Sequence, residues 1–162
     1  MAAHRTARLI PAGSRAPEFR LERLDGGETS LQEIIANGPA LLAFFKVTCP
    51  ICQLTFPFLE RIYGSGNLPI YGVSQNGPDD TREFARHFRL SLPMLLDREQ
   101  KQFPASNAYG ISSVPTMFLL ERDGTISRVV EGWNKSEIEW LGEKAGLRVI
   151  RPDDNVPAWK AG

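Results

Sequence analysis

Hydrophobic positions follow two different periods along the chain, and the change between them predicts the order of its elements. Residues 40–45 are an unbroken apolar run, which is typical of a strand buried on both faces of a sheet. From Pro50 the apolar positions recur at intervals of three and four, which predicts a helix from just after Cys49 to a turn at 64–67. Residues 68–74 predict a second strand, so the three segments form one βαβ unit with a right-handed crossover.

The segment before this unit predicts a hairpin and a short helix. Apolar and polar residues alternate over 19–22, and a turn at 25–27 returns the chain as a second strand. Ser30 and Glu33 are spaced as a capping box, which predicts a helix that runs to Ala36.

The segment after the unit predicts a further run of strands and helices. In chain order these are a helix from Asp80, a short strand at 93–96, a broken helix around Pro104, and a hairpin of 116–120 with 126–130. Asn134 and Glu137 cap a last helix, and Gly146 lies where a helix terminates.

These elements predict one domain of the α/β class. Strands that alternate with helices favour a central sheet covered by helices, and the length of 162 residues fits a single core. We expect the domain to span residues 16–146. Residues 1–15 are interpreted as a flexible lead-in, and residues 147–162, rich in proline and charge, as a loosely held C-terminal tail.

Composition excludes several classes of protein. With 42% hydrophobic and 23% charged residues, the chain can bury a core and is not typical of a disordered protein. The 19 basic residues balance the 19 acidic ones, so no charge excess indicates nucleic acid as a partner. No apolar run approaches the roughly 18 residues that a membrane helix needs.

The candidate chemistry lies in the chain's two cysteines, Cys49 and Cys52. Cys49 is expected at the N-terminus of a helix, where free amide hydrogens and the helix dipole stabilise a thiolate. Pro50 suits the first helical position because its missing N–H is not needed there. Cys52 lies three residues further on and can reach Cys49, so the pair predicts attack by Cys49 on a disulfide and resolution by Cys52.

The cysteine pair has other interpretations. Two buried core cysteines without a function are one alternative, because free cysteine is often simply buried. A zinc site needs four ligands, and the only histidines, His4 and His87, lie at no suitable spacing. The same thiolate could instead serve a peroxidase, and a non-catalytic binding or assembly module is the remaining alternative.

The chain resembles the thioredoxin-like redoxins, and within them the thiol-disulfide oxidoreductases of the TlpA and ResA type. The resemblance covers residues 16–146 and rests on four stretches: Ala16-Pro17-Glu18-Phe19 with the following hairpin, Phe44 to Cys52 with Pro57, Gly72-Val73-Ser74, and Tyr109 to Thr116 followed by Asp123-Gly124. It implies a thioredoxin fold, with a central mixed sheet flanked by helices and an N-terminal β-hairpin.

The resemblance also implies a site and partners. Pro115 is expected to be cis and to lie beside the cysteine pair, and the substrate-binding residues are expected to be Thr48, Pro50, Ile51, Val114 and Pro115. The expected partners are protein disulfide or dithiol substrates and a redox partner protein, and the chain is expected to be a monomer. No cofactor and no metal are expected.

The chain departs from the family pattern where acid and base helpers usually lie. Ala43 occupies the position of a buried Asp in thioredoxins, and Thr55 that of a Glu common in the maturation branch. Lys46 is the nearest candidate to influence Cys49, although a lysine at a strand end is more often solvated. Lys46 also stands where peroxiredoxins need Thr or Ser three residues before the reactive cysteine, which argues against a peroxidase.

The sequence leaves the direction of electron flow and the compartment open. A redox potential depends on the relative stability of the oxidised and reduced forms, which no motif reports. The N-terminal residues lack the apolar stretch of a secretory signal, so the literal expectation is cytoplasmic. The alternative is periplasmic, as the habits of the family imply, if an export signal has been removed.

Overall fold

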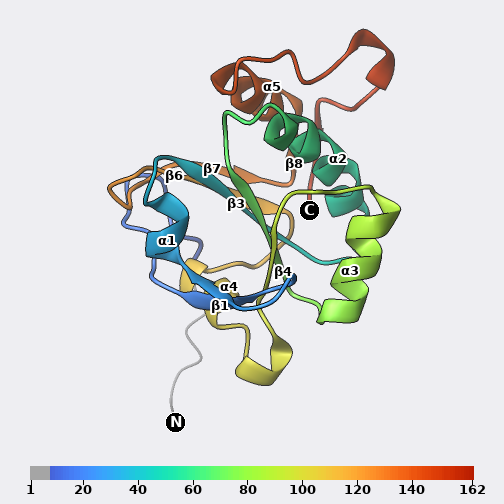
Figure 1. Cartoon of the computed structure of the whole chain (residues 1–162). Helices are drawn as coiled ribbons and strands as arrows, with labels where there is room; N and C mark the ends of the chain where they lie inside the picture. The colour runs from blue at the N-terminus through green and yellow to red at the C-terminus, as the bar shows by residue number, and fades with distance from the viewer. Residues whose placement is uncertain (1–7) are drawn as a thin grey trace.

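Seven strands form one mixed sheet in a computed structural model that describes residues 8–162 (Figure 1). The strands are β1 (Arg20–Arg23), β2 (Glu28–Ser30), β3 (Ala40–Phe45), β4 (Ile70–Ser74), β5 (Met94–Leu96), β6 (Thr116–Leu120) and β7 (Ile126–Glu131). Their order across the sheet is β2-β1-β5-β4-β3-β6-β7. Strands β3, β4 and β5 are parallel, whereas β6, β7 and the β1–β2 hairpin pair antiparallel. The predicted mixed sheet with an N-terminal hairpin is therefore confirmed.

Helices cover both sides of this sheet. They are α1 (Leu31–Ile35), α2 (Pro50–Gly64), α3 (Pro78–His87), α4 (Pro104–Tyr109) and α5 (Lys135–Lys144). Two short 3-10 turns, η1 (Glu99–Lys101) and η2 (Pro152–Asp154), and a small second sheet of β8 (Trp133–Asn134) with β9 (Trp159–Lys160) complete the chain. Figure 1 shows α2, α3 and α5 on one side of the sheet and α1 and α4 on the other.

Strand β3 divides the core between the two sides. Phe45 packs on Phe56 of α2 and Phe84 of α3, with ring centroids 4.4 and 4.9 Å away. Phe44, the next residue back, points the other way and lies 5.4 Å from the ring of Tyr109 in α4. All six residues of β3 are buried, which explains why the strand is a continuous apolar run rather than an alternating one.

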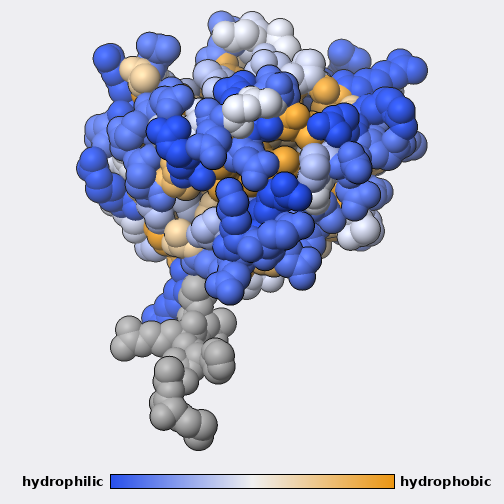
Figure 2. Space-filling model, turned by 60° about the horizontal axis from the view of Figure 1, so that its bottom comes forward, coloured by the Kyte–Doolittle hydropathy of each residue, from blue (hydrophilic) through white to orange (hydrophobic). Residues whose placement is uncertain are grey.

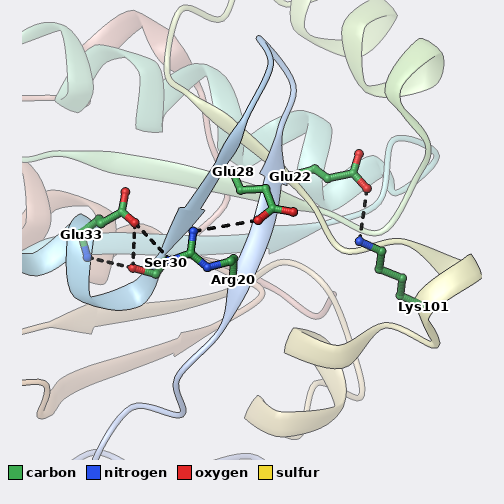
Figure 3. Close-up of polar contacts among 6 residues, drawn as sticks. All are labelled: Arg20, Glu22, Glu28, Ser30, Glu33 and Lys101. Carbon is green, nitrogen blue, oxygen red and sulfur yellow. Dashed lines mark hydrogen bonds and ion pairs between the residues drawn. The ribbon is translucent and has the colours of Figure 1, made fainter.

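The N-terminal hairpin is joined to α1 by Ser30, which caps the helix as predicted, although the reciprocal bond of a capping box, from the Ser30 N–H to the Glu33 carboxylate, is replaced by one from the Ser30 hydroxyl (Figure 3). The backbone N–H of Glu33 donates to the Ser30 hydroxyl at 3.2 Å, and that hydroxyl lies 3.3 Å from the Glu33 carboxylate. Arg20 lies 3.9 Å from Glu28 and 3.6 Å from Glu33. Because exposed ion pairs contribute little, the cap and the burial of Leu21 hold the hairpin in place.

Helix α3 begins earlier than predicted. It starts at Pro78 with Gly77 as the N-cap, whereas the sequence pattern placed its start at Asp80. Proline is favoured at the first helical position, and a glycine N-cap has no side chain to signal a start. Asp79 and Asp80 instead lie in the first turn, where a carboxylate interacts favourably with the helix dipole.

The residues before the domain are bound to it where the structure describes them. Residues 8–15 were expected to be a flexible lead-in, but Ile10 donates its N–H to the Tyr109 carbonyl at 3.2 Å and Gly13 to the Ile126 carbonyl at 2.7 Å. These hydrogen bonds lie on the α4 side and at the far edge of the sheet. The expectation for residues 1–7 lies outside the described residues.

The C-terminal tail is packed rather than loosely held. Val149 is buried beside α5 at 2% exposure. Arg61 of α2 binds both carboxylate oxygens of Asp154, at 2.8 and 3.0 Å, and this pairing lowers the pKa of Asp154 to about 2. The indole N–H of Trp133 donates to the Pro157 carbonyl at 2.6 Å. The tail, rich in proline and charge, lies on the surface but is hydrogen-bonded to the domain. The expected domain limits of 16–146 stay a prediction.

The surface is mostly polar. The face in Figure 2 is largely hydrophilic, with small apolar patches between hydrophilic residues. Within residues 8–162, Trp159 is the one large hydrophobic side chain left exposed, at 58%. No helix in the same range combines the length and apolar character that would let it cross a membrane.

Candidate active site

The site forms where β3 passes into α2. The strand ends at Phe45, and four residues later Cys49 caps the helix in an extended backbone conformation with Pro50 at the first position. Hydrogen bonds fix the connecting loop: the Val47 N–H donates to the Asn76 side chain at 2.9 Å, and the Gln53 side chain donates to the Val47 carbonyl at 3.0 Å. Cys49 therefore lies at the N-terminus of a helix, as the sequence predicted, and hydrogen bonds hold the loop before it.

The two cysteines are in direct contact but differ in exposure. The backbone N–H of Cys52 donates to the Cys49 sulfur at 3.1 Å, which is the N-cap hydrogen bond of α2. Both are free thiols; Cys52 is 0% exposed whereas Cys49 is half-buried. A hydrogen bond of this kind strengthens when the acceptor is charged, so the junction supports a thiolate at Cys49 and leaves Cys52 shielded.

The environment of Cys52 keeps its thiol protonated. Burial is the main cause that raises its pKa, and side-chain hydrogen bonding between the Cys52 and Cys49 sulfurs adds to the rise. The backbone and the positive charge of Lys46 act in the opposite direction. Near neutral pH Cys52 is therefore a neutral, inaccessible thiol until its surroundings change.

A cis peptide bond lies beside the pair, as the resemblance implied. Val114–Pro115 is cis, and the Cys49 thiol lies 3.4 Å from the Val114 carbonyl oxygen, to which it donates. Strand β6 starts at Thr116, which pairs with Phe44 of β3. That antiparallel pairing brings the loop before β6 to the same end of the sheet as the loop after β3.

The other expected substrate-binding residues form a rim around Cys49. Thr48 and Pro50 are exposed and Ile51 is half-buried. Val114 and Pro115 are buried, and the Val114 carbonyl accepts the hydrogen bond from the Cys49 thiol. Thr48, Pro50 and Ile51 adjoin the cysteines in the chain, Val114 contacts Cys49, and Pro115 follows Val114; their role in substrate binding stays a prediction.

The positions of the missing acid and base helpers are buried and neutral. Ala43 is 0% exposed within β3, and Thr55 is 0% exposed with its hydroxyl donating to the Ile51 carbonyl at 2.7 Å. Lys46 is exposed at the strand end. Among residues 8–162, no three His, Cys, Asp or Glu side chains lie together as metal ligands would.

Two contributors to the site were missed by the sequence reasoning. Asn76 follows β4 and accepts a hydrogen bond from the loop that holds Cys49. Because β4 is parallel to β3, a polar residue just after β4 could have been expected near that loop. Residues 159–162 of the tail also reach the site. Glycine at position 162 lies against Val114 and Pro115, and nothing in its local sequence indicated this.

Comparison with known proteins places this geometry among thiol-disulfide oxidoreductases. The family model described as the AhpC/TSA family matches residues 12–129. The thiol-disulfide oxidoreductase ResA of Geobacillus thermodenitrificans is 30% identical over 148 residues, which cover 88% of this chain and 80% of that protein. The methylamine utilization protein MauD of Methylobacillus flagellatus is 30% identical over 117 residues, or 70% of this chain and 54% of that protein.

A solved structure shares the fold. The thioredoxin domain of a thiol-disulfide oxidoreductase from Bacteroides vulgatus superposes with a TM-score of 0.74 at 22% identity, covering 83% of this chain and 97% of that one. The predicted thioredoxin fold is therefore confirmed for nearly the whole described chain.

Proposed function

We propose, from the premise that this chain belongs to the AhpC/TSA family and is a thiol-disulfide oxidoreductase, that Cys49 is its attacking thiol and Cys52 its resolving thiol. One observation carries the assignment of roles. The partly exposed sulfur of Cys49 is the acceptor at the start of α2, whereas the Cys52 sulfur is fully buried behind it. A substrate can meet only the first of the two.

The first step is attack on a substrate disulfide. The Cys49 thiolate forms a bond to one sulfur of the substrate, the substrate S–S bond breaks, and the departing thiolate takes up a proton from solvent. Before the attack, the Cys52 N–H stabilises the charged Cys49 sulfur by hydrogen bonding to it. The product of this step is a mixed disulfide between Cys49 and the substrate.

The second step is resolution by Cys52. Its thiol loses a proton and attacks the Cys49 sulfur, the mixed disulfide breaks, and the second substrate sulfur leaves as a thiol after protonation. Two electrons and two protons have then passed from the cysteine pair to the substrate, and the chain holds a Cys49–Cys52 disulfide. A partner dithiol restores the reduced pair by the same two steps in reverse.

The rim residues fit a protein substrate better than a small one. Thr48, Pro50 and Ile51 are neighbours of the cysteines in the chain and at least partly exposed, and the Val114 carbonyl contacts the Cys49 thiol. Within residues 8–162, the N–H of Val114 donates no hydrogen bond, and its carbonyl accepts only the Cys49 thiol. An extended substrate segment can pair with these groups as a strand does.

Trapping of the mixed disulfide tests the two roles. In a Cys52→Ser protein, a peptide disulfide should give a stable adduct on Cys49, seen as added mass and released by dithiothreitol. The Cys49→Ser protein is the matched control and should give none, because Cys52 is buried. Adduct formation by Cys49→Ser, or its absence from both variants, would sink the proposal.

The peroxidase alternative has less support. The residue three positions before Cys49 is Lys46, which is exposed and offers no hydroxyl near the sulfur. Consumption of hydrogen peroxide by the reduced protein should therefore be no faster than that of a free thiol at equal concentration.

Three further properties are proposed: the compartment, the oligomeric state and the direction of electron flow. We favour the periplasmic compartment over the cytoplasmic one, because the chain matches ResA and MauD and the resemblance to that branch implies a periplasmic protein. We propose a monomer that receives electrons from a partner protein. Titration of the Cys49/Cys52 couple against glutathione tests the direction, since a potential below the glutathione poise favours disulfide reduction, and light scattering tests the monomer.

A further inference from the structure

The last residues of the chain are fastened to the active-site end of the sheet. The indole N–H of Trp133 donates to the Pro157 carbonyl at 2.6 Å, and the N–H of Lys135 donates to the Ala158 carbonyl at 2.9 Å. Strand β9 then pairs antiparallel with β8. These hydrogen bonds guide residues 159–162, here called the C-terminal strap, toward the loop that holds the cis proline.

Two glycines let the strap pass where no side chain would fit. A Cβ placed on Gly162 would lie 2.7 Å from the Val114 carbonyl carbon and 3.2 Å from the Pro115 nitrogen, and nearer still to the Val114 oxygen. A Cβ placed on Gly132 would meet the Lys160 carbonyl and lie 3.1 Å from the Gly162 nitrogen. The backbone of the strap thus lies close to two other backbone segments, Gly132 and Val114–Pro115.

The strap and the attacking thiol approach the same carbonyl group. Cys49 donates to the Val114 oxygen, and Gly162 lies against that oxygen and its carbon. The Val114 and Pro115 side chains are buried with the strap in place. A substrate segment that pairs with Val114 would need the space that Gly162 occupies.

The strap is held by its backbone pairing with β8 and buries little side-chain surface. Residues 158–162 are all exposed, and Trp159 is 58% exposed, so few apolar contacts would be lost if the strap moved away. Segments with little buried surface open at low free-energy cost. The hydrogen bond from Trp133 to Pro157 precedes the strap and can persist when the strap is released.

We propose that the C-terminal strap is an intramolecular competitor for the substrate groove. Seated, it closes the Val114–Pro115 edge to an extended peptide and leaves the half-buried Cys49 sulfur open to small reagents. Released, it exposes the edge along which the substrate pairs. The inference deepens the proposed function, because it assumes that this edge is where a protein substrate binds.

The test compares two reagents that have the same chemistry and different size. Iodoacetamide and an iodoacetylated decapeptide both alkylate thiols, but only the peptide needs the groove. The Gly162→Val substitution should expel the strap, because its Cβ would collide with the Val114 carbonyl. Lys160→Val is the matched control, since it adds the same side chain at an exposed position of the same strap.

Relative to wild type and the control, Gly162→Val should react with the peptide at least about fivefold faster, because peptide access scales with the open fraction. Its rate with iodoacetamide should change less than about twofold. A chain shortened to end at Ala158 should match Gly162→Val and keeps the inference testable if that variant is poorly folded. If the peptide reacted no faster with Gly162→Val and with the shortened chain than with wild type, the proposed role of the strap would be overturned.

This readout is separate from the proposed function. Alkylation of Cys49 requires no turnover, so the strap can fail while Cys52→Ser still traps a mixed disulfide. If Cys52→Ser trapped no mixed disulfide but Gly162→Val was alkylated faster by the peptide, the proposed catalytic roles would be wrong and the proposed role of the strap would still be supported.

Discussion

Removal of Cys49 should leave a protein whose remaining cysteine is almost inert. In the Cys49→Ser variant, Cys52 is the single thiol, and its side chain lies in the core beneath the first turn of α2. Serine can keep the N-cap hydrogen bond to the Cys52 N–H, because a hydroxyl is a favoured capping group. The fold should therefore survive the change.

The expected loss of reactivity follows from two properties of Cys52. Burial, the main cause of its raised pKa, remains in the variant. Each pH unit by which the pKa of a thiol exceeds the pH lowers its thiolate fraction about tenfold. The reagent also needs a local opening of α2, and each 1.4 kcal/mol of opening free energy slows the reaction about tenfold again. We expect alkylation at least about 1,000-fold slower than in the unfolded variant.

Mass spectrometry of the intact protein during iodoacetamide treatment at pH 8 measures this rate, once in buffer and once in guanidinium chloride. Circular dichroism establishes that Cys49→Ser is folded in buffer. Cys52→Ser, which retains the half-exposed Cys49, should be alkylated completely in buffer over the same period. If folded Cys49→Ser reacted within about tenfold of its unfolded rate, burial would not separate the two thiols and the assigned order would be refuted.

Three further predictions concern stability. Asp97, buried at 0% exposure, accepts two backbone N–H groups at the start of α4, so Asp97→Asn should cost about 1–3 kcal/mol in urea unfolding; an unchanged midpoint would contradict this. Arg61 lowers the pKa of Asp154 from 3.8 to about 2, so the stabilisation is present above pH about 4 and lost as the pH falls toward 2. Asp154→Asn should therefore lower the Tm more at pH 7 than at pH 2, where about half of Asp154 is protonated, whereas equal losses would argue against the pair. In Gly72→Ala the new methyl group would crowd Met94 and two phenylalanine rings, and urea unfolding should show a loss of about 1–3 kcal/mol rather than a gain.

Local signals explain how much of the fold could be predicted from the sequence. Ser30 and Asn134 cap their helices as expected, each accepting the N–H three residues later, and the apolar run of β3 is buried throughout. These features depend on side chains within one turn or one strand, which sequence spacing reports directly. The cysteine pair was predictable for the same reason, since cap, proline and second thiol lie within four residues.

The packing of the tail was not predictable, because it depends on contacts between distant segments. Arg61 pairs with Asp154, 93 positions away, and the Pro157 carbonyl accepts the indole of Trp133. Composition rich in proline and charge indicates solvent exposure, and those residues are indeed largely exposed. Composition does not indicate whether a backbone carbonyl of the tail accepts a hydrogen bond from the domain, and such hydrogen bonds decide whether the tail is held against it.

The lack of an acidic helper beside Cys52 becomes less of an obstacle once the two cysteines are treated as one system. Burial raises the pKa of Cys52 first, and its hydrogen bond with Cys49 raises it second. A mixed disulfide removes the second cause, because the Cys49 sulfur is then bonded to substrate and bears neither a proton nor a charge. The backbone and the positive charge of Lys46, which lower the pKa, stay in place. In the proposed mechanism the mixed disulfide therefore removes one of the causes that raise the pKa of Cys52, while burial, the larger cause, remains.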